Sequence, residues 1–225
     1  VEIKAKLVLQ TGLHIGAGDS EMHIGGIDNS VIKHPLTQSP YIPGSSLKGK
    51  IRTLLEWRSG AVQSAPLTLK DVFKNPEEVK NILRLFGISG DTKNSEQEVA
   101  EIGVSRLAFW DCALNEAWEK AIRNDNQLLT EAKSENTIDR ITSTAGNPRQ
   151  TERVPAGAEF DFKLTMRVFD EDNKQELLKT VLSGLKLLEL DSLGGSGSRG
   201  YGKVKFTELT VDGEARNLDD IKPFE

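Results

Sequence analysis

The sequence predicts a single α+β domain of ferredoxin-like type, with the element order strand, helix, strand, strand, helix, strand. Two observations carry this prediction: helical patterns at residues 44–58 and 174–190, and alternating apolar and polar residues before and after each of them. The length of 225 residues suits one domain that carries insertions. We therefore expect an antiparallel sheet with both helices on one face.

The first strand and helix are predicted near the start of the chain. Residues 3–15 alternate apolar and polar side chains, as a strand with one wetter face does. Residues 16–43 are rich in Gly, Pro, Asp and Asn and indicate a long loop, and such loops in compact domains usually have a function. Residues 44–58 have the apolar stripe of a helix, with Ser45 or Ser46 as the expected N-cap. The stripe consists of Leu47, Ile51, Leu54 and Leu55.

The remaining elements follow two insertions. Residues 59–103 hold short helical patterns between breakers and predict a helical module. Residues 104–114 predict the second strand, whereas residues 115–156 are too polar to build a core and indicate a protruding arm. Alternation at 157–169, the helix at 174–190 and a strand after the Gly-rich segment complete the order. The expected inward residues are Phe160, Phe162, Leu164, Met166, Val168, Leu178, Val181, Leu182, Leu185, Leu188, Val204 and Phe206.

Composition limits the class of protein. Charged residues make up 28% of the chain, no apolar run approaches the roughly 20 residues of a membrane span, and the first residues are not a signal peptide. Cys112 is the only cysteine, which excludes an internal disulfide and favours a reducing, cytoplasmic location. The spacing of His14, His23 and His34 matches no helical metal-binding pair.

The charge is unevenly distributed along the chain. A formal net charge of −5 argues against a generic nucleic-acid binder. Basic residues nevertheless concentrate in "SSLKGKIR", "DRITSTAGNPRQTER" and "GSRGYGKVK". If these three stretches share one surface, that surface would suit a polyanion.

Two segments fit nucleotide-binding motifs but stand in the wrong context. "GSSLKGK" fits G-x-x-x-x-G-K, yet Ile51 stands where a P-loop has Ser or Thr. "GSGSRG" fits G-x-G-x-x-G, yet a helix precedes it and a strand follows, the reverse of the dinucleotide fold. What remains is a helix start with Lys48, Lys50 and Arg52, and a Gly-rich turn with Arg199. Both can hold phosphate groups.

Six separated blocks of the chain carry recognisable motifs: "TGLHIGAG", "GGIDNSVIKHP", "YIPGSSLKGKIRTLLE", "RLFG", "ENTIDRITSTAGNPRQTERV" and "LGGSGSRGYGKVKF". Together these blocks resemble a known family, the backbone subunits of type III-A CRISPR effector complexes (the third Csm protein of the RAMP superfamily). The resemblance extends from the first strand to about Phe206 and is weaker in residues 59–103 and the acidic tail.

The resemblance implies a modified RNA-recognition-motif palm, a β-hairpin thumb and an inserted helical lid. Such subunits stack with copies of themselves and with other Csm subunits along CRISPR RNA, and the thumb wedges into the duplex of guide and target RNA at regular intervals. The thumb's paired flanks would be "IDRIT" and "NPRQTERV". The implied parts are the palm (1–16, 44–58, 104–123 and 157–212), the catalytic loop (17–43), the helical insertion (59–103), the thumb (124–156) and the acidic tail (213–225).

The resemblance also implies a site for divalent-metal-dependent cleavage of target RNA. Asp28 matches the family's cleavage aspartate, and its carboxylate, ionised at neutral pH, can hold Mg²⁺ or Mn²⁺ or help to take a 2′-OH proton. His34 stands where many relatives have an acid. The implied RNA-binding residues are His14, Ser45, Ser46, Lys48, Lys50, Arg52, Arg140, Arg149, Arg153, Gly195 and Arg199. The nearby acids to which no role is assigned are Asp111, Glu131, Glu135 and Glu152.

Alternatives stay open at this point. Asp28 and Asn29 also suit an ordinary turn, because both side chains can hydrogen-bond their own backbone. The protein could then be a catalytically silent RAMP scaffold subunit. It could also be a stand-alone RNase that matures the guide, with His14 as general base.

Overall fold

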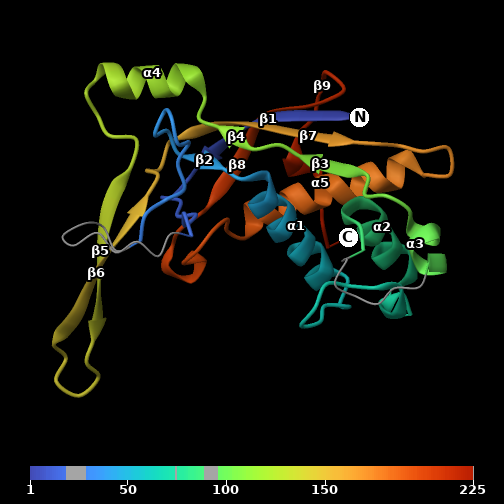
Figure 1. The fold of residues 1–225 in the computed structure, drawn as a ribbon, viewed down its shortest axis with the longest axis horizontal. Helices are drawn as coiled ribbons and strands as arrows, with labels where there is room; N and C mark the ends of the chain where they lie inside the picture. Colours follow the sequence, from blue (N-terminus) through green and yellow to red (C-terminus); the bar gives the residue numbers. More distant parts are fainter. Residues whose placement is uncertain (19–28, 74, 89–95, 225) are drawn as a thin grey trace.

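A five-stranded antiparallel sheet forms the centre of the protein (Figure 1). The computed structural model describes residues 1–18, 29–73, 75–88 and 96–224, so Asp28 lies outside the described residues. The strand order is β3-β7-β1-β8-β9, and all neighbours are antiparallel. The strands are β1 (Glu2–Leu9), β3 (Leu107–Phe109), β7 (Glu159–Met166), β8 (Val204–Val211) and β9 (Glu214–Ala215).

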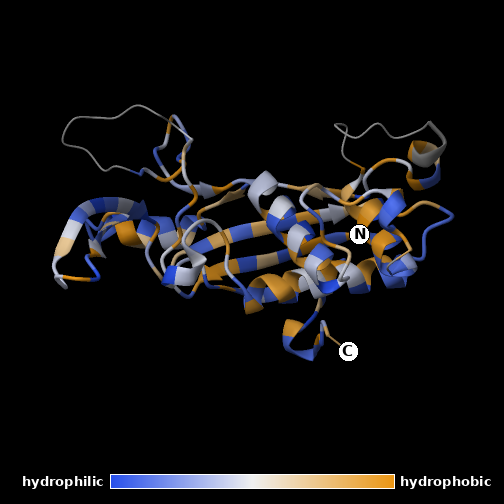
Figure 2. Ribbon diagram, turned by 90° about the horizontal axis from the view of Figure 1, so that it is seen from below, coloured by the Kyte–Doolittle hydropathy of each residue, from blue (hydrophilic) through white to orange (hydrophobic). Residues whose placement is uncertain are grey.

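Both predicted helices cover one face of this sheet (Figure 1). Helices α1 (Gly44–Arg58) and α5 (Lys174–Leu190) begin and end where the sequence predicts. Beneath them every second residue of β1 and β7 is buried, and Figure 2 shows this alternation along the strands of the sheet. Full burial of one Leu or Phe side chain is worth about 1.5–3 kcal/mol, so these rows supply much of the fold's stability. The buried rows are Ile3, Ala5, Leu7, Leu9, Phe160, Phe162, Leu164 and Met166.

Two expected inward residues are more exposed than predicted. Leu178 packs against the core but is only partly buried, and Leu177 is the fully buried leucine at the start of α5. Val168 is 38% exposed because β7 has already ended at Met166.

The insertion after α1 is helical, as the sequence predicts. It contains η1 (Leu69–Asp71), α2 (Pro76–Phe86) and α3 (Glu96–Ile102). A second, smaller apolar cluster holds it together. The Arg52 side chain ties it to α1, since the guanidinium donates to the Gly87 and Leu67 carbonyls and pairs with Glu56. The cluster consists of Ala61, Leu67, Val79, Leu83 and Ile102.

The single strand predicted at 104–114 is two strands in different sheets. After β3 the chain turns, and β4 (Cys112–Ala113) pairs with β2 (Tyr41–Ile42). The Asp111 carboxylate accepts the Gly44 N–H at 2.7 Å, which places the turn at the start of α1. The prediction of Ser45 or Ser46 as N-cap is therefore wrong: Pro43 is the N-cap residue and makes no side-chain cap, and Asp111, in the turn between β3 and β4, accepts a hydrogen bond from a helix N–H that has no partner within the helix. The first strand likewise ends at Leu9 and not at residue 15.

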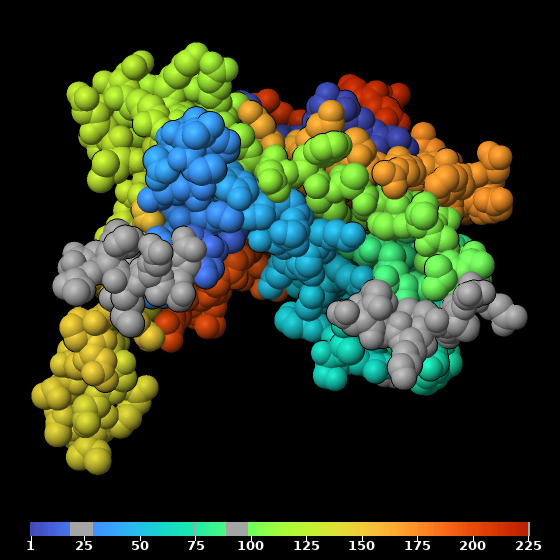
Figure 3. All heavy atoms as spheres, viewed as in Figure 1, coloured from blue at the N-terminus to red at the C-terminus, as the bar shows by residue number. Residues whose placement is uncertain are grey.

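The polar arm is a β-hairpin that projects from the body (Figures 1 and 3). Its strands are β5 (Glu131–Ile138) and β6 (Ala145–Arg153), and helix α4 (Glu116–Asn124), which the sequence did not predict, precedes them. The expected flank "IDRIT" is wrong, because Asp139 accepts the N–H groups of Ile141 and Thr142 and so starts the turn there.

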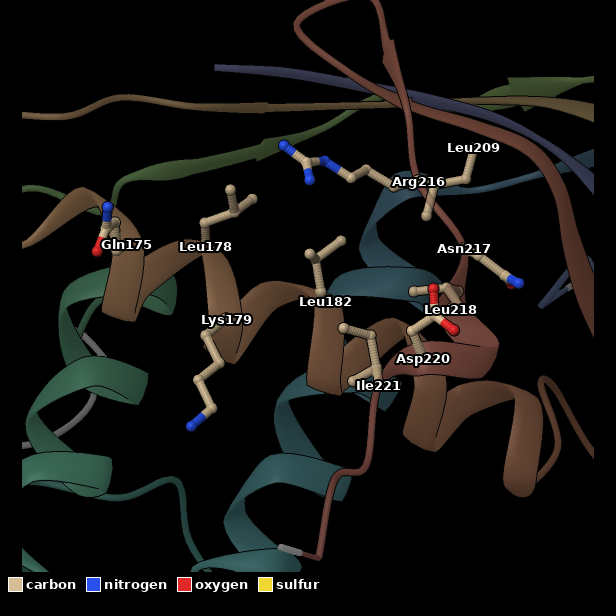
Figure 4. A pocket seen from close by; sticks show the side chains of 10 residues that line it. All are labelled: Gln175, Leu178, Lys179, Leu182, Leu209, Arg216, Asn217, Leu218, Asp220 and Ile221. Carbon is tan, nitrogen blue, oxygen red and sulfur yellow. The ribbon is translucent and has the colours of Figure 1, made fainter.

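The C-terminal segment lies against α5. Asp219, in η3 (Leu218–Asp220), binds Lys186 and Lys205 at 2.7 and 2.8 Å, and these lysines lower the pKa of its carboxyl to about 2. Leu178 and Leu182 line a shallow groove between this segment and the helix (Figure 4), and none of the predicted site residues lines it. No helix in the described ranges is long and apolar enough to cross a bilayer.

Candidate nucleic-acid interface

Glu152 lies at the base of the hairpin, where separate segments of the chain meet. Its side chain is only 5% exposed, and its Oε1 accepts hydrogen bonds from Lys33 Nζ at 2.5 Å and Thr130 Oγ1 at 2.7 Å. Its Oε2 accepts the Val31 N–H at 2.9 Å. Burial raises the pKa of Glu152, but the hydrogen bonds from Lys33, Thr130 and Val31 outweigh it and hold the pKa below its usual value.

The backbone of Glu152 binds two further segments. Its N–H donates to the Asn29 carbonyl at 2.9 Å, and its carbonyl lies 2.7 Å from His14 Nδ1. A carbonyl oxygen only accepts, so Nδ1 carries a proton and donates in this contact. One residue therefore connects the end of the first strand region, the chain after Asp28 and the hairpin.

The two described ends of the predicted catalytic loop pair with each other. Ala17 N–H donates to the Ser30 carbonyl at 3.2 Å, and Ile32 N–H donates to the Ile15 carbonyl at 2.9 Å. Residues 29–33 therefore form one stem of the loop, and Asp28 is bonded directly to that stem.

A second cluster joins the Gly-rich turn to the hairpin. Tyr201 is 1% exposed, and its hydroxyl donates to Glu135 at 2.9 Å, while Arg199 donates to the same carboxylate at 3.1 Å. The cations of Lys133 and Arg153 lie over the Tyr201 ring, 4.4 and 5.1 Å from its centroid. The Tyr201 hydrogen bond lowers the pKa of Glu135, and the charges of Arg199 and Lys133 act in the same direction. The carboxylate is therefore ionised and charge-paired at neutral pH.

The Gly-rich turn also contacts His14. The Gly195 N–H donates to the His14 carbonyl at 2.9 Å. Gly194 has φ +73°, and a Cβ at this position would lie 2.3 Å from the same carbonyl oxygen. Glycine is required here because of both the backbone conformation and this close approach.

The predicted arginines of the hairpin occupy different positions along it. Arg153 lies at the base and donates to Glu131 at 2.6 Å. Arg149 is exposed and lies opposite Glu135 in the strand register, and Arg140 lies in the turn beyond the strands. The structure therefore brings His14, Gly195, Arg153 and Arg199 together, and leaves Arg140 and Arg149 along the projecting arm.

The predicted residues of α1 differ in how free they are to bind a ligand. Ser45 is exposed, Ser46 and Lys48 are partly buried, and no described residue pairs with the Lys48 ammonium. Lys50 pairs with Asp191 at 3.0 Å. Arg52 donates to the Gly87 and Leu67 carbonyls of the helical insertion and pairs with Glu56.

Sequence reasoning gave no role to three residues that organise this surface. The sequence marks Glu152 and Glu135 only as nearby acids and gives Tyr201 no role. The sequence shows each of these residues only as an acid or a tyrosine among polar residues. Such a residue indicates a buried contact only when its hydrogen-bond partners are known.

Comparison with known proteins first identifies the class to which this protein belongs. A family model described as the RAMP superfamily matches residues 6–205. Over 97% of its length the chain is 45% identical to the CRISPR system Cms endoribonuclease Csm3 of Streptococcus thermophilus, of which it covers 92%. The Csm3 endoribonuclease of Mycobacterium tuberculosis (strain ATCC 25618 / H37Rv) is 41% identical over 97% of the chain and 91% of that relative. The chain therefore belongs to the Csm3 endoribonuclease family of the RAMP superfamily.

A solved structure agrees with this assignment. The chain resembles the Csm3–Csm4 subcomplex in the type III-A CRISPR-Cas interference complex with a TM-score of 0.53 and 29% identity. The similarity covers 92% of this chain and 75% of that one. The mixed α/β fold with a central antiparallel sheet is thus the fold of the family.

Proposed function

We propose that this protein is a repeating backbone subunit of a type III-A CRISPR effector, which binds CRISPR RNA and cleaves the complementary target RNA at regular intervals. The observation that carries the proposal is the meeting of His14, Arg153 and Arg199 beside the loop stem that follows Asp28. Membership of the Csm3 endoribonuclease family supports it. Its partners are CRISPR RNA, target RNA, further copies of the chain and other Csm subunits, in the cytoplasm.

The parts of the fold suggest separate roles in RNA binding. The sheet with α1 and α5 is the proposed palm, the hairpin is the proposed thumb, and the helices within 59–103 are the proposed lid. The hairpin has the shape for a wedge, since its two strands leave the body and only its base is packed (Figure 3). Duplex specificity then comes from base pairing, and the protein contacts phosphates in a salt-dependent way.

The proposed chemistry uses Asp28 as the catalytic carboxylate. A flipped target nucleotide can place its 2′-OH in line with the adjacent phosphate, and the carboxylate helps to remove the hydroxyl proton. The new 2′-O–P bond replaces the bond to the leaving 5′ oxygen. Precise placement is the main requirement, because attack needs near-linear geometry.

A divalent cation, Mg²⁺ or Mn²⁺, would neutralise charge on the phosphate when bound. The described ranges hold no group of three or more His, Cys, Asp or Glu side chains suited to a metal ion. The oxygens of Glu152 are engaged by protein donors. Asp28 is therefore the proposed protein ligand, and RNA oxygens would complete its coordination.

Cleavage by the assembled complex tests this function. With Asp28→Asn we expect the regular fragments of a complementary target RNA to disappear, with at least a 100-fold slower rate, while target binding is retained. Asp170→Asn, at an exposed loop acid, is the matched control and should cut like the unmodified complex. Unchanged fragments with Asp28→Asn would leave only the scaffold role.

A guide-processing RNase is the second candidate, favoured by His14, whose Nδ1 donates to the Glu152 carbonyl while no described residue hydrogen-bonds its Nε2. The isolated protein would then cut guide precursor RNA without partners, and His14→Gln would stop it. We expect no cutting by the isolated protein, because family membership favours action within the complex.

A further inference from the structure

We propose that Glu152 is a positioning residue for RNA cleavage, which holds the Asp28 side of the catalytic loop in register with the hairpin. The inference rests on the proposed function, since it concerns the same site. Glu152 does not touch the reacting atoms in this proposal. It acts through the loop stem, residues 29–33, to which the proposed catalytic Asp28 is joined by the chain.

The contacts of Glu152 join the loop stem to the hairpin, and we call this set of contacts the clamp. Its carboxylate binds Val31 and Lys33 on one side and Thr130, just before β5, on the other. The bond to the Val31 N–H specifies a backbone register, which a side-chain ion pair alone would not do. A stem shifted by one residue would present its side chains to the opposite face and lose this bond.

The backbone of the same strand strengthens the clamp. Thr151 forms a parallel bridge with Asn29, and the Glu152 N–H donates to the Asn29 carbonyl. The stem is thus held by β6 at the residue that follows Asp28 in the chain. The position of that residue is therefore set by its contacts with the hairpin base.

Burial makes the clamp depend on the negative charge. The carboxylate is 5% exposed, and three donors reach its two oxygens. A glutamine has one acceptor oxygen, so it can satisfy Val31 or the pair of Lys33 and Thr130, but not both. Lys33 would also lose its buried counter-ion.

His14 connects the clamp to the proposed RNA surface. Its Nδ1 donates to the Glu152 carbonyl, and its own carbonyl accepts the Gly195 N–H. These hydrogen bonds therefore hold the loop stem, His14 and the Gly-rich turn in position relative to the Glu152 backbone. This arrangement accounts for a nearly buried acid at the base of the hairpin.

The test uses Glu152→Gln in the assembled complex with a guide-complementary target RNA and Mg²⁺. We expect the single-turnover cleavage rate to fall at least tenfold while the Kd for target RNA changes less than twofold. In the isolated protein, amide hydrogen exchange of Val31 should become faster. A merely structural role would change binding and rate together.

The matched control is Glu189→Gln. Glu189 is 4% exposed, and its carboxylate also accepts hydrogen bonds from a backbone N–H, that of Phe206, and from a lysine, Lys186. It belongs to α5, however, and bonds to β8 rather than to the loop stem. Its substitution should leave cleavage and Val31 exchange unchanged. If Glu152→Gln does not assemble, Thr130→Val and Lys33→Met each remove one donor and should each slow cleavage about threefold or more without weakening target binding.

The outcomes separate this inference from the proposed function. A Glu152→Gln complex that cuts at the normal rate, when Asp28→Asn does not cut, would overturn the positioning role alone. A loss of rate that follows entirely from weaker target binding would overturn it as well. Normal cutting by Asp28→Asn would instead overturn the proposed site.

Discussion

The hydroxyl of Tyr201 donates a hydrogen bond to the Glu135 carboxylate at 2.9 Å, and this contact fastens the Gly-rich turn to the hairpin. The two residues are 66 positions apart. Tyr201 is 1% exposed and the cations of Lys133 and Arg153 lie over its ring, so water has little access to the hydroxyl as a substitute partner.

Tyr201→Phe should lower the free energy of unfolding by about 1.5–3 kcal/mol, the range for a hydrogen bond to a charged group. Denaturant unfolding measures this change. Tyr41→Phe is the control, because no described residue bonds the Tyr41 hydroxyl, and it should change stability much less. Equal effects of the two substitutions would contradict the role of the contact.

Gly194→Ala should weaken the contact between the Gly-rich turn and His14. The new methyl group would clash with the His14 carbonyl, and the φ of residue 194 is +73°, which strains any residue other than glycine. Both effects lower the stability of the folded protein. Gly157 has φ +85° with no atom within 4 Å of the Cβ position, so Gly157→Ala measures the strain alone. We expect about 1–2 kcal/mol of destabilisation for Gly157→Ala and clearly more for Gly194→Ala in thermal or denaturant unfolding. A smaller effect at Gly194 would show that the turn moves freely.

The stability of the protein should depend on the charge of Glu152 at acidic pH. Its pKa is lowered in the folded state, so its stabilisation is fully present above the ordinary value of 4.5 and is lost as pH falls through the folded value. Urea midpoints measured between pH 6 and pH 3 should therefore converge for the unmodified protein and Glu152→Gln as pH falls. If the plots of urea midpoint against pH stay parallel for the two proteins, the ionised carboxylate is not the stabilising species.

Lys48→Met should reduce the salt dependence of CRISPR RNA binding. Burial lowers the pKa of the Lys48 amine and the charge of Arg52 adds to this, and no described residue neutralises the ammonium. Loss of one phosphate contact lowers the slope of log K against log salt by about 0.7 for single-stranded RNA. Lys120→Met, on α4 and paired with Glu116, should leave the slope unchanged. An unaltered slope with Lys48→Met would exclude this lysine from the RNA contact.

The elements that the sequence predicted best are those with a strong local pattern. Helix α5 begins at Lys174 and ends at Leu190 as predicted, because apolar residues recur along it with helical spacing. The polar composition of the arm was equally clear, although its turn was misplaced. Asp139 shows the reason: its two backbone hydrogen bonds end the strand, and such bonds depend on a conformation that composition does not report.

The sequence by itself determined the alternating strands, the two covering helices, the polar arm and the family resemblance, since periodicity and short motifs are local. Only the tertiary structure decided which polar groups pair. Val31 and Glu152 are 121 residues apart, and Gly44 and Asp111 are 67 apart. Their hydrogen bonds exist because β6 and β4 bring those carboxylates to N–H groups that burial would otherwise leave unpaired. For the same reason Arg52, by sequence a candidate for RNA, is bound by the helical insertion.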